Sequence, residues 1–157
     1  MKKIKLVVKT KSKTYPIIIG SNLLKDIPNI MRSNNIKFNK CLIVVDKKVP
    51  QNNLKILKNR IPCKTKLIHL FYSSEKNKNQ KSVDKIIEKL LKHNFSRNDC
   101  IISLGGGITG DVTGFAASLF KRGIKFINIP TTLLAQVDSS IGGKTGINNS
   151  YGKNLVG

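Results

Sequence analysis

The sequence predicts an α/β fold in which a doubly wound parallel sheet is covered by helices and preceded by an N-terminal β-hairpin. Short, continuously apolar runs alternate with segments whose apolar residues recur at helical spacing. Runs such as residues 41–46 and 100–104 are typical of strands buried on both faces, as in parallel sheets. Residues 82–91 are apolar on one side only, which indicates a helix packed against such a sheet. The length of 157 residues fits a single domain with its own core.

The predicted elements follow this pattern along the chain. Residues 4–9 and 15–19 are rich in β-formers and are separated by a polar turn, which predicts a hairpin. A helix is expected over residues 21–31, with Ser21 as its capping residue. The remaining expected strands are residues 41–46, 65–72, 100–104 and 125–129, and the remaining expected helices include residues 54–57, 82–91 and 109–120.

Four loops follow the carboxyl ends of the predicted parallel strands. Because parallel strands all end at one edge of a sheet, we expect these loops to open on the same side. Ligands of open α/β sheets bind at that edge, so the loops are the candidate site. They begin at Asp46, Ser73, Gly105 and Pro130.

The formal net charge of +21 raises the possibility of a nucleic-acid-binding protein. Residues 1–100 carry 24 basic and 6 acidic groups, whereas residues 101–157 carry 5 and 2. The lysines are scattered among asparagines and are not interleaved with aromatic residues as in stacking platforms. We therefore interpret the charge as a solvated surface of biased composition and expect no specific nucleic-acid partner, with a nucleic-acid-binding face as the alternative.

The chain has no apolar run close to the roughly 20 residues that span a bilayer, so no membrane partner is expected. The four aliphatic residues near its N-terminus, Ile4 and Leu6–Val8, are too few for the apolar core of a signal peptide. The sequence therefore predicts a cytoplasmic protein.

The cysteines and histidines do not form a recognisable ligand pattern. Cys41, Cys63 and Cys100 are odd in number, far apart and without C-x-x-C spacing, which predicts buried or half-buried free thiols in a reducing compartment. His69 and His93 stand 24 positions apart with no acidic or cysteine neighbour at ligand spacing. We therefore predict no metal ligands in this sequence.

The segment Gly105–Gly110 matches G-x-G-x-x-G between a predicted strand and a predicted helix. Glycines there allow a sharp turn and let a pyrophosphate approach the amides of the helix N-terminus. The ribose-binding acid expected about 20 residues on is missing, because position 130 is proline. Two alternatives stay open: the glycines serve tight helix–strand packing, and Asp111 only stabilises the first helical turn.

A second cluster of polar and turn-forming residues covers positions 130–154. Its GGKT at 142–145 is not a phosphate-binding P-loop, because Asp138 stands where that motif requires glycine. Lys144 and Lys153 each follow a glycine and suit a phosphate or carboxylate ligand. The alternative is that they are ordinary surface lysines.

Three segments together resemble the 3-dehydroquinate synthase family of the shikimate pathway, and the resemblance extends along the whole chain. They are GGGITGDVTGFAAS, KRGIKFINIPTTLLAQVDSSIGGKTGIN and YGKN. GGGxxGD also occurs in metal-dependent alcohol and glycerol dehydrogenases, whereas PTTLLAQVDSSIGGKT distinguishes the synthases. The resemblance implies a Rossmann-like domain whose glycines cradle the pyrophosphate of NAD.

The resemblance also implies an activity. Members of the family bind and recycle NAD while they eliminate phosphate from 3-deoxy-arabino-heptulosonate 7-phosphate, and they form 3-dehydroquinate. The implied partners are this small-molecule substrate and, in the full-length form, a second copy in a homodimer.

By resemblance, residues that match the family's motifs in the predicted loops are implied to contact NAD. One departure concerns the family's D-G-E-x-x-K loop, where Ser73 and Ser74 replace aspartate and glycine. Serine lacks glycine's freedom at positive φ, so a different path of this loop is expected. The implied cofactor-binding residues are Asp46, Ser73, Ser74, Glu75, Lys78, Gly106, Gly107, Thr109, Gly110, Asp111, Thr131, Thr132, Lys144 and Lys153.

Four residues are implied to contact the substrate or take part in catalysis. Arg122 would reach across a dimer interface to the neighbouring subunit's substrate; its alternative is a plain surface arginine. The implied catalytic residues are Asp138, Lys144, Asn154 and Arg122.

Family members continue with a mostly helical domain that supplies a glutamate and two histidines as ligands of zinc or cobalt. The sequence ends at Gly157, so we expect residues 1–157 to be the N-terminal NAD-binding domain of a truncated or split form, which is incomplete for catalysis alone. In a split form, a separate C-terminal half is the expected partner. The alternatives are a non-catalytic nucleotide-binding remnant and a related NAD- and metal-dependent alcohol dehydrogenase-like domain.

Overall fold

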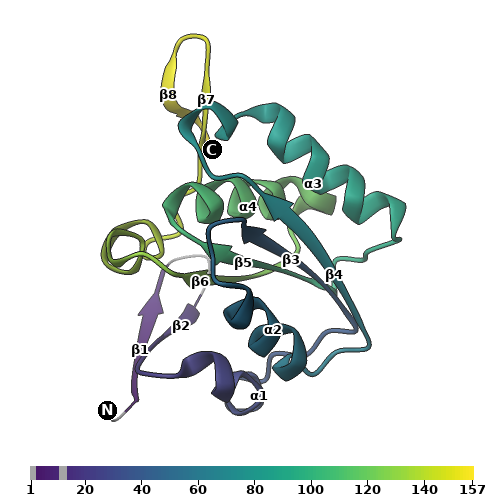
Figure 1. Ribbon diagram of the computed structural model, residues 1–157, viewed down its shortest axis with the longest axis vertical. Coiled ribbons are helices and arrows are strands. Elements are labelled where there is room, and N and C mark those ends of the chain that lie inside the picture. Colours follow the sequence, from purple (N-terminus) through teal and green to yellow (C-terminus); the bar gives the residue numbers. More distant parts are fainter. Residues whose placement is uncertain (1–2, 11–13) are drawn as a thin grey trace. The chain divides into compact units, whose positions relative to one another are not determined.

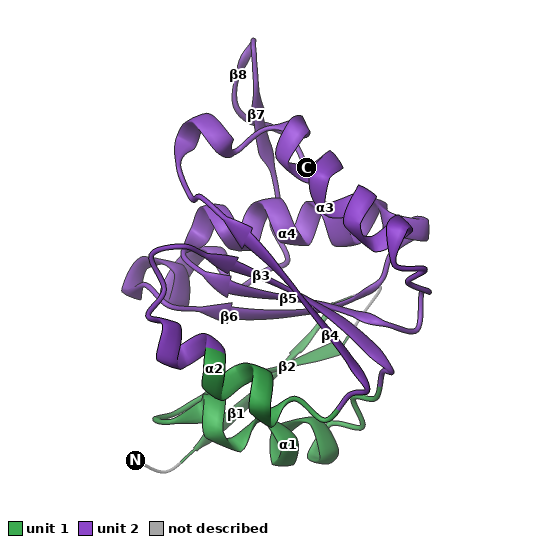
Figure 2. Cartoon of the chain, turned by 45° about the vertical axis from the view of Figure 1, so that its right-hand side comes forward, with its two compact units in different colours: residues 1–37, 55–62 green, residues 38–54, 63–157 purple. Residues whose placement is uncertain are grey.

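The computed structural model describes residues 3–10 and 14–157 and divides into two compact units (Figure 2). Unit 1 comprises residues 1–37 and 55–62, and unit 2 comprises residues 38–54 and 63–157. Within the described ranges, no helix has the length and apolar character needed to cross a membrane.

Unit 1 contains the predicted N-terminal hairpin. Strands β1 (Ile4–Lys9) and β2 (Thr14–Ile19) pair antiparallel, which confirms the prediction. Helix α1 (Leu23–Ser33) starts two residues later than expected. Its N-cap is Asn22 in the left-handed region rather than Ser21, so the predicted cap was wrong. Most of α2 (Gln51–Arg60) also belongs to this unit.

The sheet of unit 2 has four parallel strands in the order β4-β3-β5-β6. The two central strands, β3 (Lys40–Asp46) and β5 (Cys100–Gly105), are buried almost throughout, as expected for a parallel sheet covered on both faces. The outer strands are β4 (Thr65–Phe71) and β6 (Lys125–Pro130). This arrangement confirms the predicted α/β class and parallel sheet.

Helices α3 (Gln80–Lys92) and α4 (Gly107–Leu119) lie on the same face of this sheet (Figure 1). The Asn79 side chain caps α3 by accepting a hydrogen bond from the Ser82 amide at 3.0 Å. Between the helices and the strands lies an apolar core that includes Leu42, Val44, Val83, Ile86, Leu90, Ile101, Val112 and Phe115.

The strand order creates a switch point in the sheet. The chain passes from β3 to β4 on one side, then returns to place β5 on the other side of β3. Ligands of such sheets bind outside the carboxyl ends of the strands at this point. Asp46 and Gly105 are the last residues of β3 and β5, so the fold places two predicted site loops there.

Unit 2 ends with a hairpin that the sequence did not predict. After the short helical segment η3 (Ala135–Ser139), strands β7 (Ile147–Asn149) and β8 (Gly152–Val156) pair antiparallel (Figure 1). The Asn149 side chain closes the turn by accepting hydrogen bonds from the amides of Tyr151 and Gly152 at 2.9 and 3.1 Å.

Candidate functional site

The glycine loop joins β5 directly to α4 at the switch point. Gly106 is the N-cap residue with extended backbone, and α4 begins at Gly107. Among the described residues no side chain caps this helix start. The amides of the first turn are therefore available to an anion, which the helix dipole also favours.

The three glycines of this loop differ in what surrounds them. A Cβ on Gly105 would lie 2.7 Å from Thr109 Oγ1, and one on Gly107 would lie 3.0 Å from Ser139 Oγ, so packing alone accounts for both. A Cβ on Gly106 would meet the methyl carbon and Oγ1 of Thr132 at 3.4 and 3.6 Å, which are ordinary contacts. Close packing therefore explains two of the glycines, whereas Gly106 leaves open the approach to the helix amides.

Two further predicted cofactor residues of α4 face the protein interior. Thr109 is fully buried, and its Oγ1 has no hydrogen-bond partner among the described residues. Gly110 is also buried, and a Cβ there would lie 3.3 Å from the Asn128 amide group. Thr109 thus packs against Gly105, and Gly110 allows α4 to pack closely against Asn128 of β6.

A buried lysine connects three segments of the candidate site. Lys78 is 6% exposed, and its Nζ lies 2.6 Å from Asp111 Oδ2 and 2.6 Å from Asn154 Oδ1. A buried ammonium requires such partners, because its desolvation is otherwise costly. The structure thus brings together three predicted site residues from the loop after β4, from α4 and from β8. We call Lys78, Asp111 and Asn154 the lysine network.

Asn148 of β7 connects the lysine network to Glu75 by hydrogen bonds. The sequence prediction did not include Asn148 among the site residues. Its amide donates to the Lys78 carbonyl at 2.8 Å, and its Nδ2 donates to Glu75 Oε2 at 2.8 Å. Its Oδ1 accepts from the Asn154 amide at 3.1 Å. The residue lies inside the resembling segment, but its role depends on the β7–β8 hairpin, which the sequence did not predict.

The loop after β4 follows a path that serine can adopt. Ser74 has φ −154° and ψ 157°, which is extended backbone, and its carbonyl accepts from the Asn77 amide at 3.0 Å. Glu75–Asn77 form a single helical turn, η1. Ser73 and Ser74 are half-buried. The replacement of the family's glycine by Ser74 therefore requires no strained backbone here.

Asp46 is buried at the end of β3, and its Oδ1 accepts a hydrogen bond from the Lys48 amide at 3.0 Å. This contact fixes the turn on the β3 side of the switch point.

A second region, residues 131–144, carries other predicted site residues but exposes them; we call it the open segment. Its start is anchored, because the Thr131 amide donates to the Gly105 carbonyl at 2.9 Å and Thr132 Oγ1 accepts from the Ala135 amide at 3.2 Å. Leu133 and Leu134 within it are 77% and 72% exposed. The exposed predicted site residues of this segment are Thr131, Thr132, Asp138 and Lys144.

The remaining two predicted site residues are also exposed. Lys153 lies on β8 beside Asn154. Arg122 lies in η2 (Phe120–Arg122), beyond the carboxyl end of α4. The 13 residues of α4 separate Arg122 from the glycine loop by about 20 Å, so the structure does not bring Arg122 to the site within one chain.

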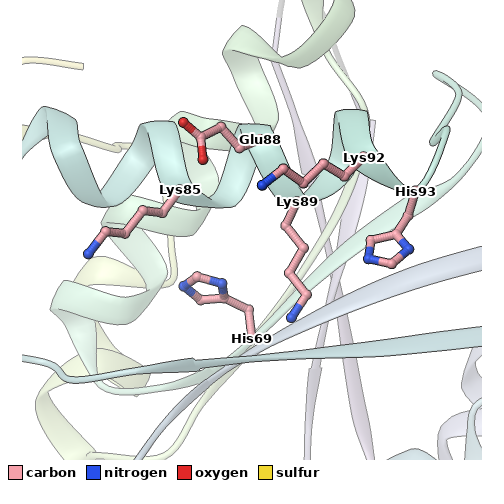
Figure 3. Close-up of a pocket in the computed structure, with 6 residues that line it drawn as sticks. All are labelled: His69, Lys85, Glu88, Lys89, Lys92 and His93. Carbon is pink, nitrogen blue, oxygen red and sulfur yellow. The ribbon is translucent and has the colours of Figure 1, made fainter.

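A pocket of about 310 Å³ lies apart from these loops, between β4 and α3 (Figure 3). Burial, together with the charges of Lys89 and Lys85, lowers the pKa of His69 below its usual 6.5. Among the described residues, no three His, Cys, Asp or Glu side chains gather in a way that could hold a metal ion. The pocket is lined by His69, Lys85, Glu88, Lys89, Lys92 and His93.

A parallel sheet with a glycine turn at its switch point defines the class of Rossmann-like α/β proteins. Within that class, residues 68–157 match the family model described as 3-dehydroquinate synthase N-terminal, so the chain belongs to this family. The family predicted from the sequence is confirmed, and a dehydrogenase-like domain is not favoured.

Curated relatives agree along nearly the entire chain. The 3-dehydroquinate synthase of Pelagibacter ubique is 61% identical over 154 residues, which are 98% of this chain and 42% of the relative. That of Blochmanniella pennsylvanica is 42% identical over 156 residues, again 98% of this chain and 42% of the relative. The chain thus spans about two fifths of the length of these relatives.

Solved structures show the same architecture in related enzymes. A 2-deoxy-scyllo-inosose synthase complexed with carbaglucose-6-phosphate, NAD+ and Co2+ has a TM-score of 0.86 at 26% identity, covering 98% of this chain and 42% of that one. The 2-epi-5-epi-valiolone synthase of Streptomyces hygroscopicus, with NAD+ and Zn2+ bound, has a TM-score of 0.78 at 28% identity, covering 97% and 42%.

Proposed function

We propose that this chain is the NAD-binding part of a 3-dehydroquinate synthase, which converts 3-deoxy-arabino-heptulosonate 7-phosphate to 3-dehydroquinate and phosphate. The observation that carries this proposal is the lysine network, which gathers three motif segments of the family beside the glycine loop.

The glycine loop fits a dinucleotide. The uncapped first turn of α4 offers amides to a pyrophosphate, and Gly106 keeps the approach to them free of a side chain. Lys78 holds the Asp111 carboxylate by one oxygen, which leaves acceptor capacity for a ribose hydroxyl. Bound at these residues, NAD would supply the hydride acceptor and donor of the reaction.

The open segment fits the recognition of the substrate. Lys144 offers an ammonium as a point charge for a phosphate or carboxylate, and Asp138 offers acceptors for substrate hydroxyls. Asn154 contributes from the lysine network, where its side chain is already oriented by Lys78. Such fixed polar groups lower the cost of organising the substrate.

The described residues do not fit a catalytic metal, because no suitable group of ligands occurs among them. We therefore assign binding and orientation, but no metal chemistry, to this part of the enzyme.

The proposal includes assembly and location. We infer a homodimer in which Arg122, which is exposed beyond α4 and distant from its own glycine loop, contacts the substrate of the neighbouring subunit. The remaining part of the enzyme, whether on the same or a separate chain, is the second partner. The free state of all three cysteines fits a cytoplasmic location.

Calorimetric titration with NAD and ATP tests the cofactor assignment. We expect NAD to bind and ATP to bind more weakly. Gly106→Asp should abolish NAD binding without unfolding the chain, because the position has room for a Cβ but a carboxylate would repel the pyrophosphate. Ser118→Asp, exposed near the opposite end of α4, is the matched control and should bind NAD normally. Equal or tighter binding of ATP would contradict the proposal.

A further inference from the structure

Two cysteines that are distant in the sequence lie together in unit 2. Cys41 is the second residue of β3 and is fully buried, and half-buried Cys63 precedes β4 by two residues. The amides of Lys64 and Thr65 donate to the Asn39 carbonyl at 3.0 and 3.1 Å, which holds the two backbones side by side. The Sγ atoms of the two cysteines are 3.5 Å apart.

This separation is that of two thiols in contact. A disulfide requires about 2.0 Å between the sulfur atoms, and small side-chain rotations can supply the remaining approach. Cys100 lies opposite Cys41 in the β3–β5 register, but its sulfur is engaged with the Ile101 carbonyl at 3.3 Å and it is fully buried. Cys100 therefore serves as an internal control for the pair.

The two thiols of the pair differ in reactivity. Its hydrogen bond with Cys41, aided by the charge of Lys66, lowers the pKa of Cys63 against the opposing effect of desolvation. The same contact and burial raise the pKa of Cys41, and burial raises that of Cys100. Cys63 is thus the thiol that combines access to solvent with the greater tendency to ionise.

We propose that Cys63 and Cys41 form a peroxide-reactive dithiol, in which Cys63 is oxidised first and Cys41 closes an intramolecular disulfide. The Cys63 thiolate attacks the O–O bond of a peroxide, forms an S–O bond and releases hydroxide or alkoxide. The Cys41 sulfur then attacks the Cys63 sulfur, the S–O bond breaks, and the oxygen leaves as water with the Cys41 proton. Two thiols lose two electrons, and the peroxide is reduced to two waters or to water and an alcohol.

This modification is independent of the NAD site, and it would be reversible by an external dithiol. Cytosolic disulfides are usually transient or redox-sensing, which fits a pair that is reduced at rest and close enough to be joined.

The test is oxidation of the reduced chain with equimolar hydrogen peroxide, followed by thiol titration under denaturing conditions and non-reducing peptide mapping. The three free thiols should fall to one, with the Cys41 and Cys63 peptides joined, and dithiothreitol should restore all three. Cys100→Ser should still form the disulfide and lose both remaining thiols. Cys63→Ser should keep both of its thiols.

Mapping of the unmutated chain keeps the test valid even if the variant at fully buried Cys100 fails to fold. A disulfide that contains Cys100, linkage only between the Cys63 residues of two chains, or oxidation of Cys63 to the sulfinic acid without linkage would each overturn the proposal.

Discussion

The lysine network and the open segment are both parts of the predicted site, yet their local environments are opposite. In the network, buried Lys78 holds Asp111 and Asn154 at 2.6 Å each. In the open segment, Asp138 and Lys144 face solvent. The first region is held in place by contacts within this chain, whereas the second presents its charged side chains without such burial.

We expect the two regions to have different roles. Lys78 is buried and already paired with both of its partners, so the network costs little to organise when a ligand binds and suits a cofactor that stays bound. Exposed lysine side chains lose rotamer freedom on binding, and the surrounding enzyme and the substrate must supply the compensation. NAD binding should therefore depend mainly on the network, and turnover mainly on the open segment.

The largest expected effect is loss of turnover on Lys144→Ala. The assay is phosphate release by a chimera that joins this chain to the remaining part of the Pelagibacter ubique enzyme. Removing a charged contact to the phosphate or carboxylate of the substrate should lower kcat/KM by about a hundredfold or more, with NAD affinity nearly unchanged. Lys121→Ala, at an exposed lysine after α4, is the control. Full activity of Lys144→Ala would contradict the proposal that turnover depends mainly on the open segment.

The next largest effect is expected at Lys78. Lys78→Met keeps the length of the side chain but leaves the Asp111 carboxylate without its partner, which should lower stability by about 3 kcal/mol. NAD affinity should fall by about tenfold or more, because Asp111 is no longer held in place. Denaturant unfolding and calorimetry measure the two effects.

The control for that experiment is Lys76→Met, at an exposed lysine of the same loop. It should change neither quantity. NAD binding by Lys78→Met at the original affinity, with the chain still folded, would show that the network is structural only.

A smaller effect is expected for Asn148→Ala. This variant removes the side-chain contacts to Glu75 and to the Asn154 amide but keeps the backbone bond to Lys78. We expect a loss of about 1 kcal/mol in stability and a weakening of NAD binding by severalfold. Asn52→Ala on the exposed side of α2 should leave both unchanged. An unaltered NAD affinity in Asn148→Ala would show that Asn148 does not help the lysine network to bind NAD.

The sequence predicted the sheet and the glycine turn because both depend on local pattern. The strand at residues 41–46 is continuously apolar and needs no partner to be recognised, and the glycines stand between a strand and a helix. The cap of α1 was wrong because Asn22 adopts the left-handed region and takes the position expected for Ser21.

The lysine network could not be derived from pattern alone. Lys78 and Asn154 are 76 residues apart, and their contact depends on the β7–β8 hairpin, whose short strands carry little apolar signal. The Cys41–Cys63 contact was also missed because it is distant in the sequence: 22 residues and a helix separate the two cysteines. Free thiols were predicted correctly, but their proximity was not.

The smallest expected effect concerns His69, which lies outside both regions. Its titration changes folding stability with pH, and this change must be known before the two regions are compared at different pH values. In the folded chain its pKa lies below 6.5, chiefly because of burial and then because of Lys89 and Lys85. The unfolded chain therefore binds more protons as the pH falls below about 6.5, and folding stability decreases there. Above this pH both states carry neutral His69, and its contribution to the pH dependence vanishes.

We expect His69→Gln to flatten the decline in stability below pH 6.5 by less than about 1 kcal/mol, as measured by urea unfolding from pH 7.5 to pH 5. His93→Gln is the control, because His93 lines the same pocket but is exposed. Glu88 is the acidic residue that lines the pocket, together with Lys85, Lys89 and Lys92. If the slope of stability against pH is unchanged in His69→Gln, the decline comes from other groups. The lysine network and the open segment would then have to be compared at a single pH.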